Sequence, residues 1–233
     1  MDKQYWHAKW QQLDIGFNQT SPNVLLQKFL PQFGLTAGMK IFVPLCGKTV
    51  DMLWLLEQGY EVIGVEVSPL ACEAFFKEYD IQVTVTQHHD FMVYKNQDKT
   101  ITLFCGDFFG LNKEILGHID LIYDRAALIA LPEEIRFQYV NHLINLIDLE
   151  TKIFLITTHF HQSQIQGPPF SLGEHEVHAL YPPHFTIQQL YNKPIQSIAA
   201  HLKTKGLMQA HEQAYVIVCN TPEVPTLQVM QEV

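Results

Sequence analysis

The chain has 233 residues, of which 47% are hydrophobic and 17% are charged, and its formal net charge is −9. A chain of this length can bury a large core as a single domain, which we expect over residues 1–220, followed by a loosely held tail over 221–233. The negative charge and the lack of a Lys/Arg cluster disfavour nucleic acid, which is not expected as a partner, because binding a polyanion needs a basic face.

The composition also argues against a membrane protein. No apolar segment approaches the ~18 uninterrupted residues of a membrane helix, so no membrane partner is expected. Four cysteines are widely spaced, form no CxxC pair and follow no secretory leader: Cys46, Cys72, Cys105 and Cys219. This pattern is typical of buried, reduced thiols in a cytoplasmic protein. No long apolar strip remains outside the core pattern, and we expect a monomer.

The N-terminal segment, residues 1–35, places two tryptophans on one face of an expected helix. Trp6 and Trp10 are four residues apart, and the loop 15–19 follows them. Packing of both rings on the flank of the sheet is the simpler interpretation of these residues. The alternative is a lid, because an aromatic helix placed before the first strand can cover the carboxyl ends of the strands.

The next segment predicts a strand, a turn, a helix and a second strand. The run 39–44 is apolar and β-prone, the turn 45–48 contains Gly47, and a helix is expected over 49–57. The second strand, 61–65, ends at Glu66. In an open parallel sheet this carboxylate lies at the lip of the ligand crevice, where it can accept both hydroxyl protons of a ribose. A nucleoside-containing ligand is therefore predicted.

Strand and helix signals continue to alternate along the rest of the chain. Helices are expected over 70–79, 132–147 and 174–180, and strands over 100–105, 119–124, 152–158, 185–190 and 214–219. Such alternation favours an α/β fold with a mostly parallel central sheet and helices on both of its faces.

The turn at Gly47 indicates which nucleoside is bound. A dinucleotide fingerprint needs several glycines so that the backbone can approach a pyrophosphate, and this turn has one. S-adenosylmethionine has a ribose and an adenine but no phosphates, so it does not need the missing glycines. Asp107 and Phe108 follow the third strand, and they can take the adenine amino group and one face of the ring.

The order of several short motifs resembles one family. They are Trp6-x3-Trp10, Gly16-Phe17-Asn18-Gln19, Phe42-Val43-Pro44-Leu45-Cys46-Gly47-Lys48, Gly64-Val65-Glu66-Val67-Ser68, Tyr123-Asp124-Arg125-Ala126-Ala127-Leu128 and Gly167-Pro168-Pro169-Phe170-Ser171. This set resembles the thiopurine S-methyltransferase family over roughly residues 5 to 219, and the compact chain is similar to its bacterial branch. The resemblance implies a Rossmann-like, class I S-adenosylmethionine-dependent methyltransferase.

The resemblance also implies a set of cofactor-binding residues: Trp6, Trp10, Phe17, Leu45, Gly47, Glu66, Asp107, Phe108 and Arg125. Leu45 would hold the amino-acid part of the cofactor and Glu66 its ribose. Phe17 and Arg125 would also contact the substrate. With the resemblance, the lid becomes the favoured interpretation of the two tryptophans. The product of the reaction would be S-adenosylhomocysteine.

Methyl transfer from a sulfonium to a thiol is an in-line displacement in which opposite charges cancel. A dry, preorganised pocket therefore matters more than a strong acid or base, and no catalytic residue is expected. Arg125 can stabilise a thiolate and orient the acceptor, or it can simply pair with Asp124. Asp124 can assist proton removal or position Arg125, and positioning is the favoured interpretation.

Departures from the family pattern bear on the acceptor. The segment after the fifth strand reads Thr157-Thr158-His159-Phe160-His161-Gln162, where family members commonly carry acidic and aromatic residues. A basic residue of the family's substrate pocket falls close to His201, with Lys203 and Lys205 nearby.

The histidines do not predict a metal site. His88-His89, His159-x-His161 and the pair His175 and His178 lack the H-E-x-x-H spacing and a cysteine quartet, so no metal is expected. Cys46 lies in the cofactor turn without a fixed base, and a small buried residue is its simplest interpretation.

The sequence therefore predicts an enzyme that methylates the sulfur of a small aromatic or heterocyclic thiol. Selenium or tellurium compounds are further acceptors by resemblance to bacterial members. Two alternatives stay open. One is a nicotinamide-dependent oxidoreductase, which Glu66 would also suit. The other is a cofactor-binding protein without turnover, if the segment around His159 blocks the acceptor pocket.

Overall fold

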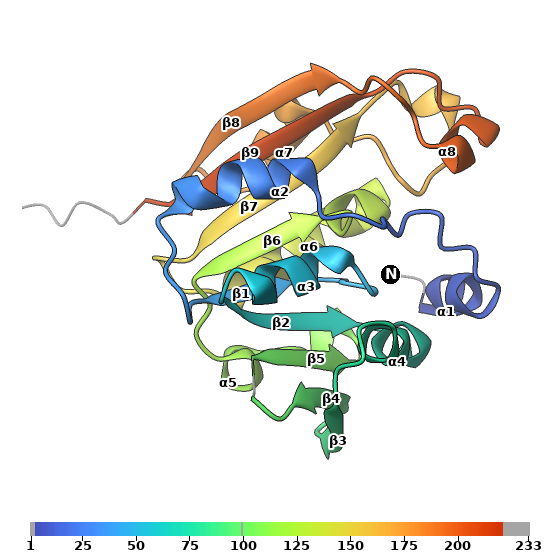
Figure 1. Ribbon diagram of the computed structural model, residues 1–233. Coiled ribbons are helices and arrows are strands. Elements are labelled where there is room, and N and C mark those ends of the chain that lie inside the picture. The colour runs from blue at the N-terminus through green and yellow to red at the C-terminus, as the bar shows by residue number, and fades with distance from the viewer. Residues whose placement is uncertain (1–2, 99, 221–233) are drawn as a thin grey trace, which may run out of the picture.

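The structure is a computed structural model that describes residues 3–98 and 100–220, and its centre is a nine-stranded sheet (Figure 1). The strand order is β3-β4-β5-β2-β1-β6-β7-β9-β8. The strands are β1 (Lys40–Val43), β2 (Glu61–Glu66), β3 (Val83–His88), β4 (Phe91–Asn96), β5 (Ile101–Cys105), β6 (Leu121–Arg125), β7 (Lys152–His159), β8 (Phe185–Pro194) and β9 (His211–Cys219). The predicted C-terminal tail, 221–233, lies outside the described residues.

The middle of the sheet is parallel and both of its edges are antiparallel. The strands β5, β2, β1, β6 and β7 pair in parallel, as in the register Phe42↔Ile63 and Phe42↔Ile122. The pairs β3–β4, β4–β5, β7–β9 and β8–β9 are antiparallel. All strands except β4 and β9 therefore run in one direction, which confirms the predicted mostly parallel α/β sheet.

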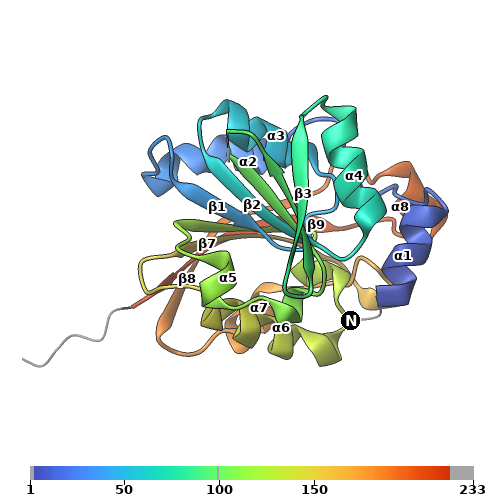
Figure 2. The ribbon, with the colours of Figure 1, turned by 90° about the horizontal axis from the view of Figure 1, so that it is seen from below.

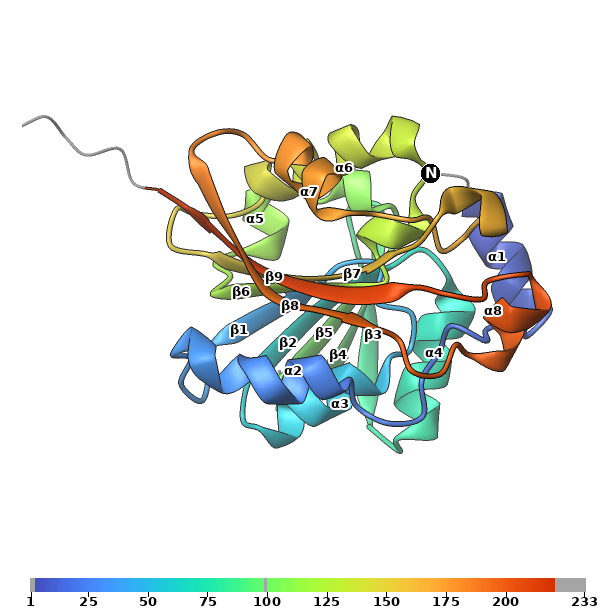
Figure 3. The same ribbon diagram turned by 90° about the horizontal axis from the view of Figure 1, so that it is seen from above.

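Helices cover both faces of this sheet (Figures 2 and 3). One face carries α2 (Val24–Phe29), α3 (Val50–Glu57) and α4 (Pro69–Glu78), and the other carries α5 (Lys113–Leu116), α6 (Glu133–Asn145) and α7 (Glu174–Leu180). Two further helices, α1 (Lys3–Gln11) and α8 (Ala200–Thr204), lie beyond the carboxyl ends of the parallel strands. Short 3-10 turns are η1 (Leu30–Phe33), η2 (Phe108–Gly110), η3 (Leu128–Ala130) and η4 (Gln162–Gln164).

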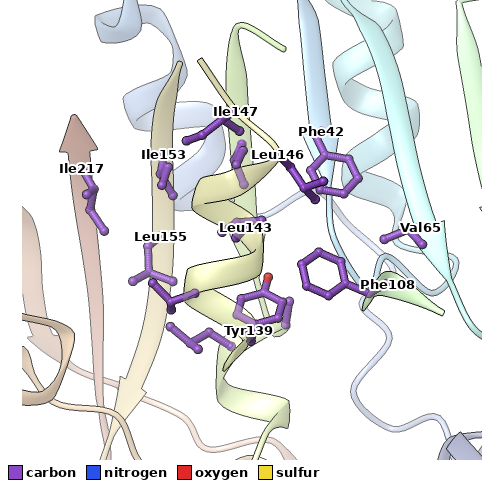
Figure 4. Close-up of a cluster of buried hydrophobic side chains, with 14 of the residues drawn as sticks. Phe42, Val65, Phe108, Tyr139, Leu143, Leu146, Ile147, Ile153, Leu155 and Ile217 are labelled. Atoms are coloured by element: carbon purple, nitrogen blue, oxygen red, sulfur yellow. The ribbon is translucent and has the colours of Figure 1, made fainter. Parts of the chain in front are cut away.

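Two hydrophobic cores, one on each face, hold these layers together. Phe42, Phe108, Tyr139 and Leu155 belong to the core under α6 (Figure 4). The neighbouring strand residues Tyr123, Phe154 and Ile156 belong to the core under α2 and α3. Successive side chains of a strand point to opposite faces, so each strand contributes to both cores. The same alternation decides which face each site residue occupies.

The order of the strands places a ligand crevice between β1 and β6. The chain winds from β1 outward through β2 to β5 and then returns to lay β6 on the other side of β1. Ligands of open α/β sheets bind at this switch point, outside the carboxyl ends of the strands. The cofactor turn predicted after β1 opens at this place.

The structure also shows elements that the sequence did not predict. The hairpin of β3 and β4 was missed, although residues 83–86 alternate between Val and Thr and β4 begins with four apolar residues; β3 is an edge strand whose side chains are nearly all exposed. Within the predicted N-terminal lid segment, α2 and η1 pack into the core of the sheet through Leu26 and Phe33. Only the part before them is free to act as a lid. No helix among the described residues is long and apolar enough to cross a bilayer.

Candidate active site

A cavity of about 470 Å³ opens at the carboxyl ends of the central strands. Its walls come from α1 and the loop after it, the turn after β1, the ends of β2 and β6, and the connection from β8 to β9. This volume is within the range of small-molecule sites. Most of the predicted cofactor residues line it: Trp6, Trp10, Phe17, Leu45, Gly47, Glu66 and Arg125.

The turn after β1 is built around the carboxylate of Glu66. Its Oε2 accepts the backbone N–H of Gly47 at 2.9 Å, and its Oε1 accepts the N–H of Ser68 at 2.8 Å. Leu45 and Gly47 have positive φ angles of 47° and 55°, which bend the chain so that the Gly47 amide points at the carboxylate. Each carboxylate oxygen keeps a lone pair for a further donor.

Burial gives Glu66 an unusual proton affinity. Glu66 is only 6% exposed. Burial raises the pKa of Glu66 to about 7, and hydrogen bonds from the backbone amides of Ser68, Gly47 and Val67 oppose that rise. The carboxylate is therefore partly protonated at neutral pH. Donors that arrive from a ligand favour its ionised form.

Three aromatic side chains form a cluster above this turn. The ring of Phe17 lies edge-on at 5.8 Å from both Trp6 and Trp10. The ring of Trp10 lies 3.1 Å from the point that a Cβ on residue 47 would occupy, a tight contact that adds to the positive φ in favouring glycine there. We refer to Trp6, Trp10 and Phe17 as the aromatic lid. All three residues line the cavity, and their role as a lid over the cofactor stays a prediction.

The two predicted adenine-binding residues do not line the cavity. Phe108 is 1% exposed and stacks on Tyr139 with ring centroids 4.8 Å apart, inside the core under α6. The carboxylate of Asp107 pairs with Lys3 of α1 at 2.6 Å and accepts the N–H of Phe109. Contact with adenine through Asp107 would replace or rearrange the pair with Lys3. Their role in cofactor binding stays a prediction.

Arg125 pairs with a carboxylate of α3 and not with the expected Asp124 of β6. Its Nη1 lies 3.6 Å from Oδ2 of Asp51, which stands in the first turn of α3 and is fully buried. The hydroxyl of Tyr123 donates to the same Oδ2 at 2.9 Å, and the N–H of Asn23 donates to Oδ1 at 2.7 Å. Asp51 therefore holds Arg125 at the cavity wall.

The expectation that Asp124 positions Arg125 is wrong. Asp124 points to the opposite face of β6, where its carboxylate accepts the hydroxyl of Tyr139 at 2.8 Å and the N–H of Leu128 at 3.1 Å. It is fully buried, and burial raises its pKa to about 6 against those hydrogen bonds. Neighbouring residues of a strand face opposite ways, so Asp124 does not reach the cavity through which proton removal would occur.

The far wall of the cavity is formed by the connection between β8 and β9. His201 and Lys205 line it, and Lys203 does not. The ring of His201 lies 2.8 Å from the point that a Cβ on Gly16 would occupy, so this wall touches the loop that carries Phe17. Burial, with Lys205 nearby, lowers the pKa of His201.

The segment around His159 does not block the cavity. Thr158 lines the wall, but His159 turns toward Ser171, and His161 contacts Ser163 outside it. Pro168 and Pro169, which belong to one of the family motifs, line the cavity.

The cysteines and histidines form no metal site among the described residues. Over 3–98 and 100–220, no three His, Cys, Asp or Glu side chains gather as metal ligands do, and the absence of a metal stays a prediction. The four cysteines are free, and three are buried as predicted, whereas Cys219 is only partly buried. Burial raises the pKa of Cys46, which suits a small packing residue better than a nucleophile.

The sequence assigned no role to three acidic residues that line the cavity, Asp14, Asp51 and Glu212. Asp51 follows the glycine turn by four residues, and an acid in the first turn of a helix is usually a helix-stabilising charge. Only its burial beside Tyr123 shows another role. Glu212 lies in a polar stretch that gave no strand signal.

Comparison with known proteins identifies the family. The family model described as thiopurine S-methyltransferase matches residues 1–220. A thiopurine S-methyltransferase of Nitrosospira multiformis is 39% identical over 223 residues, which cover 95% of this chain and 100% of the relative. That of Marinobacter nauticus is 39% identical over 219 residues, covering 94% and 99%. The chain belongs to the thiopurine S-methyltransferase family. It is therefore an S-adenosylmethionine-dependent methyltransferase, as predicted.

Solved structures support the fold of this methyltransferase. A 1,6-didemethyltoxoflavin-N1-methyltransferase of Burkholderia thailandensis, with its substrate and S-adenosylhomocysteine bound, has a TM-score of 0.61 at 12% identity, covering 94% of this chain and 87% of that one. A methyltransferase of Anabaena variabilis has a TM-score of 0.60 at 17% identity, covering 94% and 95%. Both share the Rossmann-like class I fold.

The methyltransferase should depend on Asp51 for stability as well as for the placement of Arg125. We expect Asp51→Asn to lower the free energy of unfolding by about 1–3 kcal/mol. The NH2 group of the new side chain replaces one carboxylate oxygen, so a donor that faced this oxygen loses its acceptor. Tyr123→Phe removes one hydroxyl from the same network and should cost about 1 kcal/mol or less. Urea denaturation of the two variants and the unmodified enzyme measures both. An Asp51→Asn loss no larger than that of Tyr123→Phe would contradict this account.

Proposed function

We propose that this methyltransferase transfers the methyl group of S-adenosylmethionine to the sulfur of a small aromatic or heterocyclic thiol. Selenium and tellurium compounds are proposed as further acceptors. One observation carries the proposal: a single cavity under the aromatic lid contains both the Glu66 turn and the Arg125 guanidinium. The names of the relatives, which are thiopurine S-methyltransferases, support the same acceptor class.

The residues around the turn fit a nucleoside with a charged tail and no phosphates. Glu66 is buried with one lone pair free on each oxygen, which suits two ribose hydroxyls. Leu45 and Gly47 would face the amino-acid part, and the ring of Trp10 closes over Gly47. When bound, S-adenosylmethionine supplies a methyl group on a sulfonium sulfur. Asp107 and Phe108 are proposed for the adenine, on the condition that Lys3 releases Asp107.

The residues at the other end of the cavity would prepare the acceptor. Arg125 is 14% exposed at its side chain, so its charge is only weakly screened by water and can stabilise a thiolate. Phe17 would contact a flat ring from above. The lid excludes water, which strengthens these electrostatic contacts. The protein itself needs to bind the reactants, orient them and exclude water from them.

The two alternatives have less support. A nicotinamide-dependent oxidoreductase conflicts with the family. A pyrophosphate would also find only one glycine in the turn, Gly47, and the ring of Trp10 already lies against it. A binding protein without turnover was conditional on a blocked acceptor pocket, and His159 lies outside the cavity. We also propose a monomer that acts in the cytoplasm on a small molecule, not on nucleic acid, which suits the charge of −9 and the free cysteines.

Two measurements on the full chain test the proposal. Titration calorimetry should show tight binding of S-adenosylhomocysteine and none of NAD. A radiolabelled methyl-transfer assay with a thiopurine and a panel of thiols and selenols should then yield methylated product. Tight binding of S-adenosylhomocysteine without product from any acceptor would favour the binding protein.

Glu66 should make cofactor binding dependent on pH. Ribose hydroxyls donate to the ionised carboxylate, whereas the free protein holds Glu66 with a pKa of about 7. Affinity for S-adenosylhomocysteine should therefore fall up to about tenfold for each pH unit below 7 and level off above it. Calorimetry from about pH 5.5 to about pH 8.5, in buffers of different ionisation enthalpy, should also show a proton released on binding below pH 7.

Glu66→Gln is the control for this dependence. The amide cannot ionise, so binding should be weaker and flat over the same pH range. A Glu66→Ala variant is less informative, because it also leaves the N–H groups of Gly47 and Ser68 without an acceptor and so reduces stability. Equal affinity in Glu66→Gln and the unmodified enzyme would reject the ribose assignment.

Arg125 should matter more for turnover than for stability. Asp51 keeps its bonds from Tyr123 and Asn23 when the guanidinium is removed, so the fold should tolerate Arg125→Ala. We expect kcat/KM with an aryl thiol to fall by about 10- to 100-fold, the size of one lost charge contact in the transition state. The comparison variant is Arg136→Ala, which removes a buried guanidinium bonded to Leu131 and Ser171 and should lose more stability. A purely structural Arg125 would show a large drop in melting temperature with kcat/KM unchanged.

A further inference from the structure

Four carboxylates line the cavity, and they differ in whether they have partners. Glu66, Asp51 and Asp14 are hydrogen-bonded or ion-paired to neighbouring groups. The fourth, Glu212, has no hydrogen-bond or ion-pair partner for its side chain in the part of the chain that the structure describes. A half-buried charge without a partner is unfavourable, so a carboxylate of this kind in a ligand cavity points to a ligand group as its partner.

The position of Glu212 places it on the acceptor side of the cavity. It lies near the start of β9, opposite Thr158 of β7, and β9 is two strands from β6, which carries Arg125. Two strand spacings are about 10 Å, a gap that a long arginine side chain can partly bridge. Glu66 stands on β2, four strands from β9. Glu212 is thus much closer to the proposed thiolate-binding group than to the ribose-binding one.

Strand alternation gives Glu212 and Arg125 the same face of the sheet. Ala214 of β9 packs in the core under α2 and α3, as Tyr123 of β6 does. Residues two apart on a strand share a face, so Glu212 lies on the same face as Ala214, and Arg125 on the same face as Tyr123. Both charged residues line the cavity beyond this core. A cation and an unpaired carboxylate therefore face the same space.

The charged and titratable groups near Glu212 can be named. Arg125 and the Tyr123 hydroxyl belong to β6, and the Tyr123 hydroxyl is already donated to Asp51. Lys193 is the cross-strand neighbour on β8, and no ion pair joins it to Glu212. The neighbour on β7, Thr158, carries no charge. Glu212 is thus the one carboxylate among these described neighbours that is free to exchange a proton with a ligand.

We propose that Glu212 is the proton acceptor for the thiol substrate. When a neutral thiol binds, its S–H bond breaks, the proton passes to a carboxylate oxygen of Glu212, and the thiolate is left facing Arg125. The sulfur then attacks the sulfonium methyl carbon, so that a new S–C bond forms as the sulfonium C–S bond breaks. S-adenosylhomocysteine leaves as a neutral thioether, and Glu212 returns its proton to water when the products leave.

Burial makes Glu212 a better base than an exposed carboxylate. It raises the pKa of Glu212, and the nearby Arg125 opposes part of that rise. Sequence reasoning required no base, because an acidic heterocyclic thiol is already ionised. The proposal rests on the proposed thiol methyltransferase function and extends it to thiols that are neutral at the working pH.

A pair of aryl thiols distinguishes a proton acceptor from a residue that only shapes the cavity. One thiol should have a pKa below the assay pH and the other a pKa well above it. Glu212→Gln should lower kcat/KM for the weakly acidic thiol by about 100-fold or more, the usual size of general-base catalysis, and leave the ionised thiol within about twofold. Glu212→Asp, which keeps a carboxylate, should recover part of the loss.

A second measurement does not depend on turnover. In the dead-end complex with S-adenosylhomocysteine, the weakly acidic thiol should show the absorbance of a thiolate, while calorimetry in different buffers detects no released proton. Glutamine cannot take the proton, so in Glu212→Gln the thiolate absorbance should disappear. If some thiolate still forms in this variant, its proton should be released to the buffer. Release of one proton per bound thiolate by the unmodified enzyme would overturn the proposal.

The controls distinguish the possible failures. Glu57→Gln changes an exposed carboxylate at the end of α3, outside the cavity, and should behave as the unmodified enzyme in every assay. Unchanged melting temperature and S-adenosylhomocysteine affinity in Glu212→Gln would show an intact fold and cofactor site. An equal loss with both thiols would mean that Glu212 only arranges the cavity, and no loss would mean that it has no role. If the unmodified enzyme methylates neither thiol, the proposed function itself fails.

Discussion

The site depends on one buried carboxylate that is held by two backbone amides. Glu66 ends β2, and its oxygens tie the turn after β1 to the start of α4 through Gly47 and Ser68. The bond to Gly47 exists only because the chain adopts left-handed angles at Leu45 and Gly47, which aim the amide inward. The free protein thus keeps a desolvated acid at the ligand crevice. Since burial opposes its ionisation, stability from this group is lost as the pH rises through its folded pKa of about 7, and a ligand that donates hydrogen bonds to it restores the balance.

The pleat of the strands then divides the polar residues into two sets. On β6, Tyr123 and Arg125 face α3, where they meet Asp51, while Asp124 between them faces α6 and Tyr139. The first set reaches the cavity and can act on a ligand. The second is fully buried, and its hydrogen bonds stabilise the packing of α6 and of the turn at Leu128. Two adjacent residues of one motif therefore have separate roles, one in the site and one in the core.

This division explains how far the sequence could predict the site. Patterns of apolar residues located the strand ends, and therefore Glu66, because the carboxyl ends of parallel strands meet at one edge of the sheet, whereas Arg125 was assigned to the site by the family resemblance. They could not give the direction of Asp124, which follows from the register of the pleat, nor the pair of Lys3 with Asp107, which joins distant segments. The hairpin of β3 and β4 was missed although its strands contain Val, Thr and aromatic residues. The start of β9 is polar, so it lacked the alternation that marks a half-buried strand. Glu212 was missed for the same reason.

The two ends of the cavity differ in what holds them in place. The proposed cofactor end consists of turns that are fixed by the Glu66 carboxylate, by backbone amides and by the two main cores. The acceptor end is formed by the connection between β8 and β9, which has a small core of its own that contains Ile198 and Leu207. Its contact with the lid passes through His201 and Gly16, where no larger residue fits. Substitutions in that small core can reshape the acceptor wall without disturbing the Glu66 turn. The proposed acceptor wall is for this reason the part of the cavity that the two main cores constrain least.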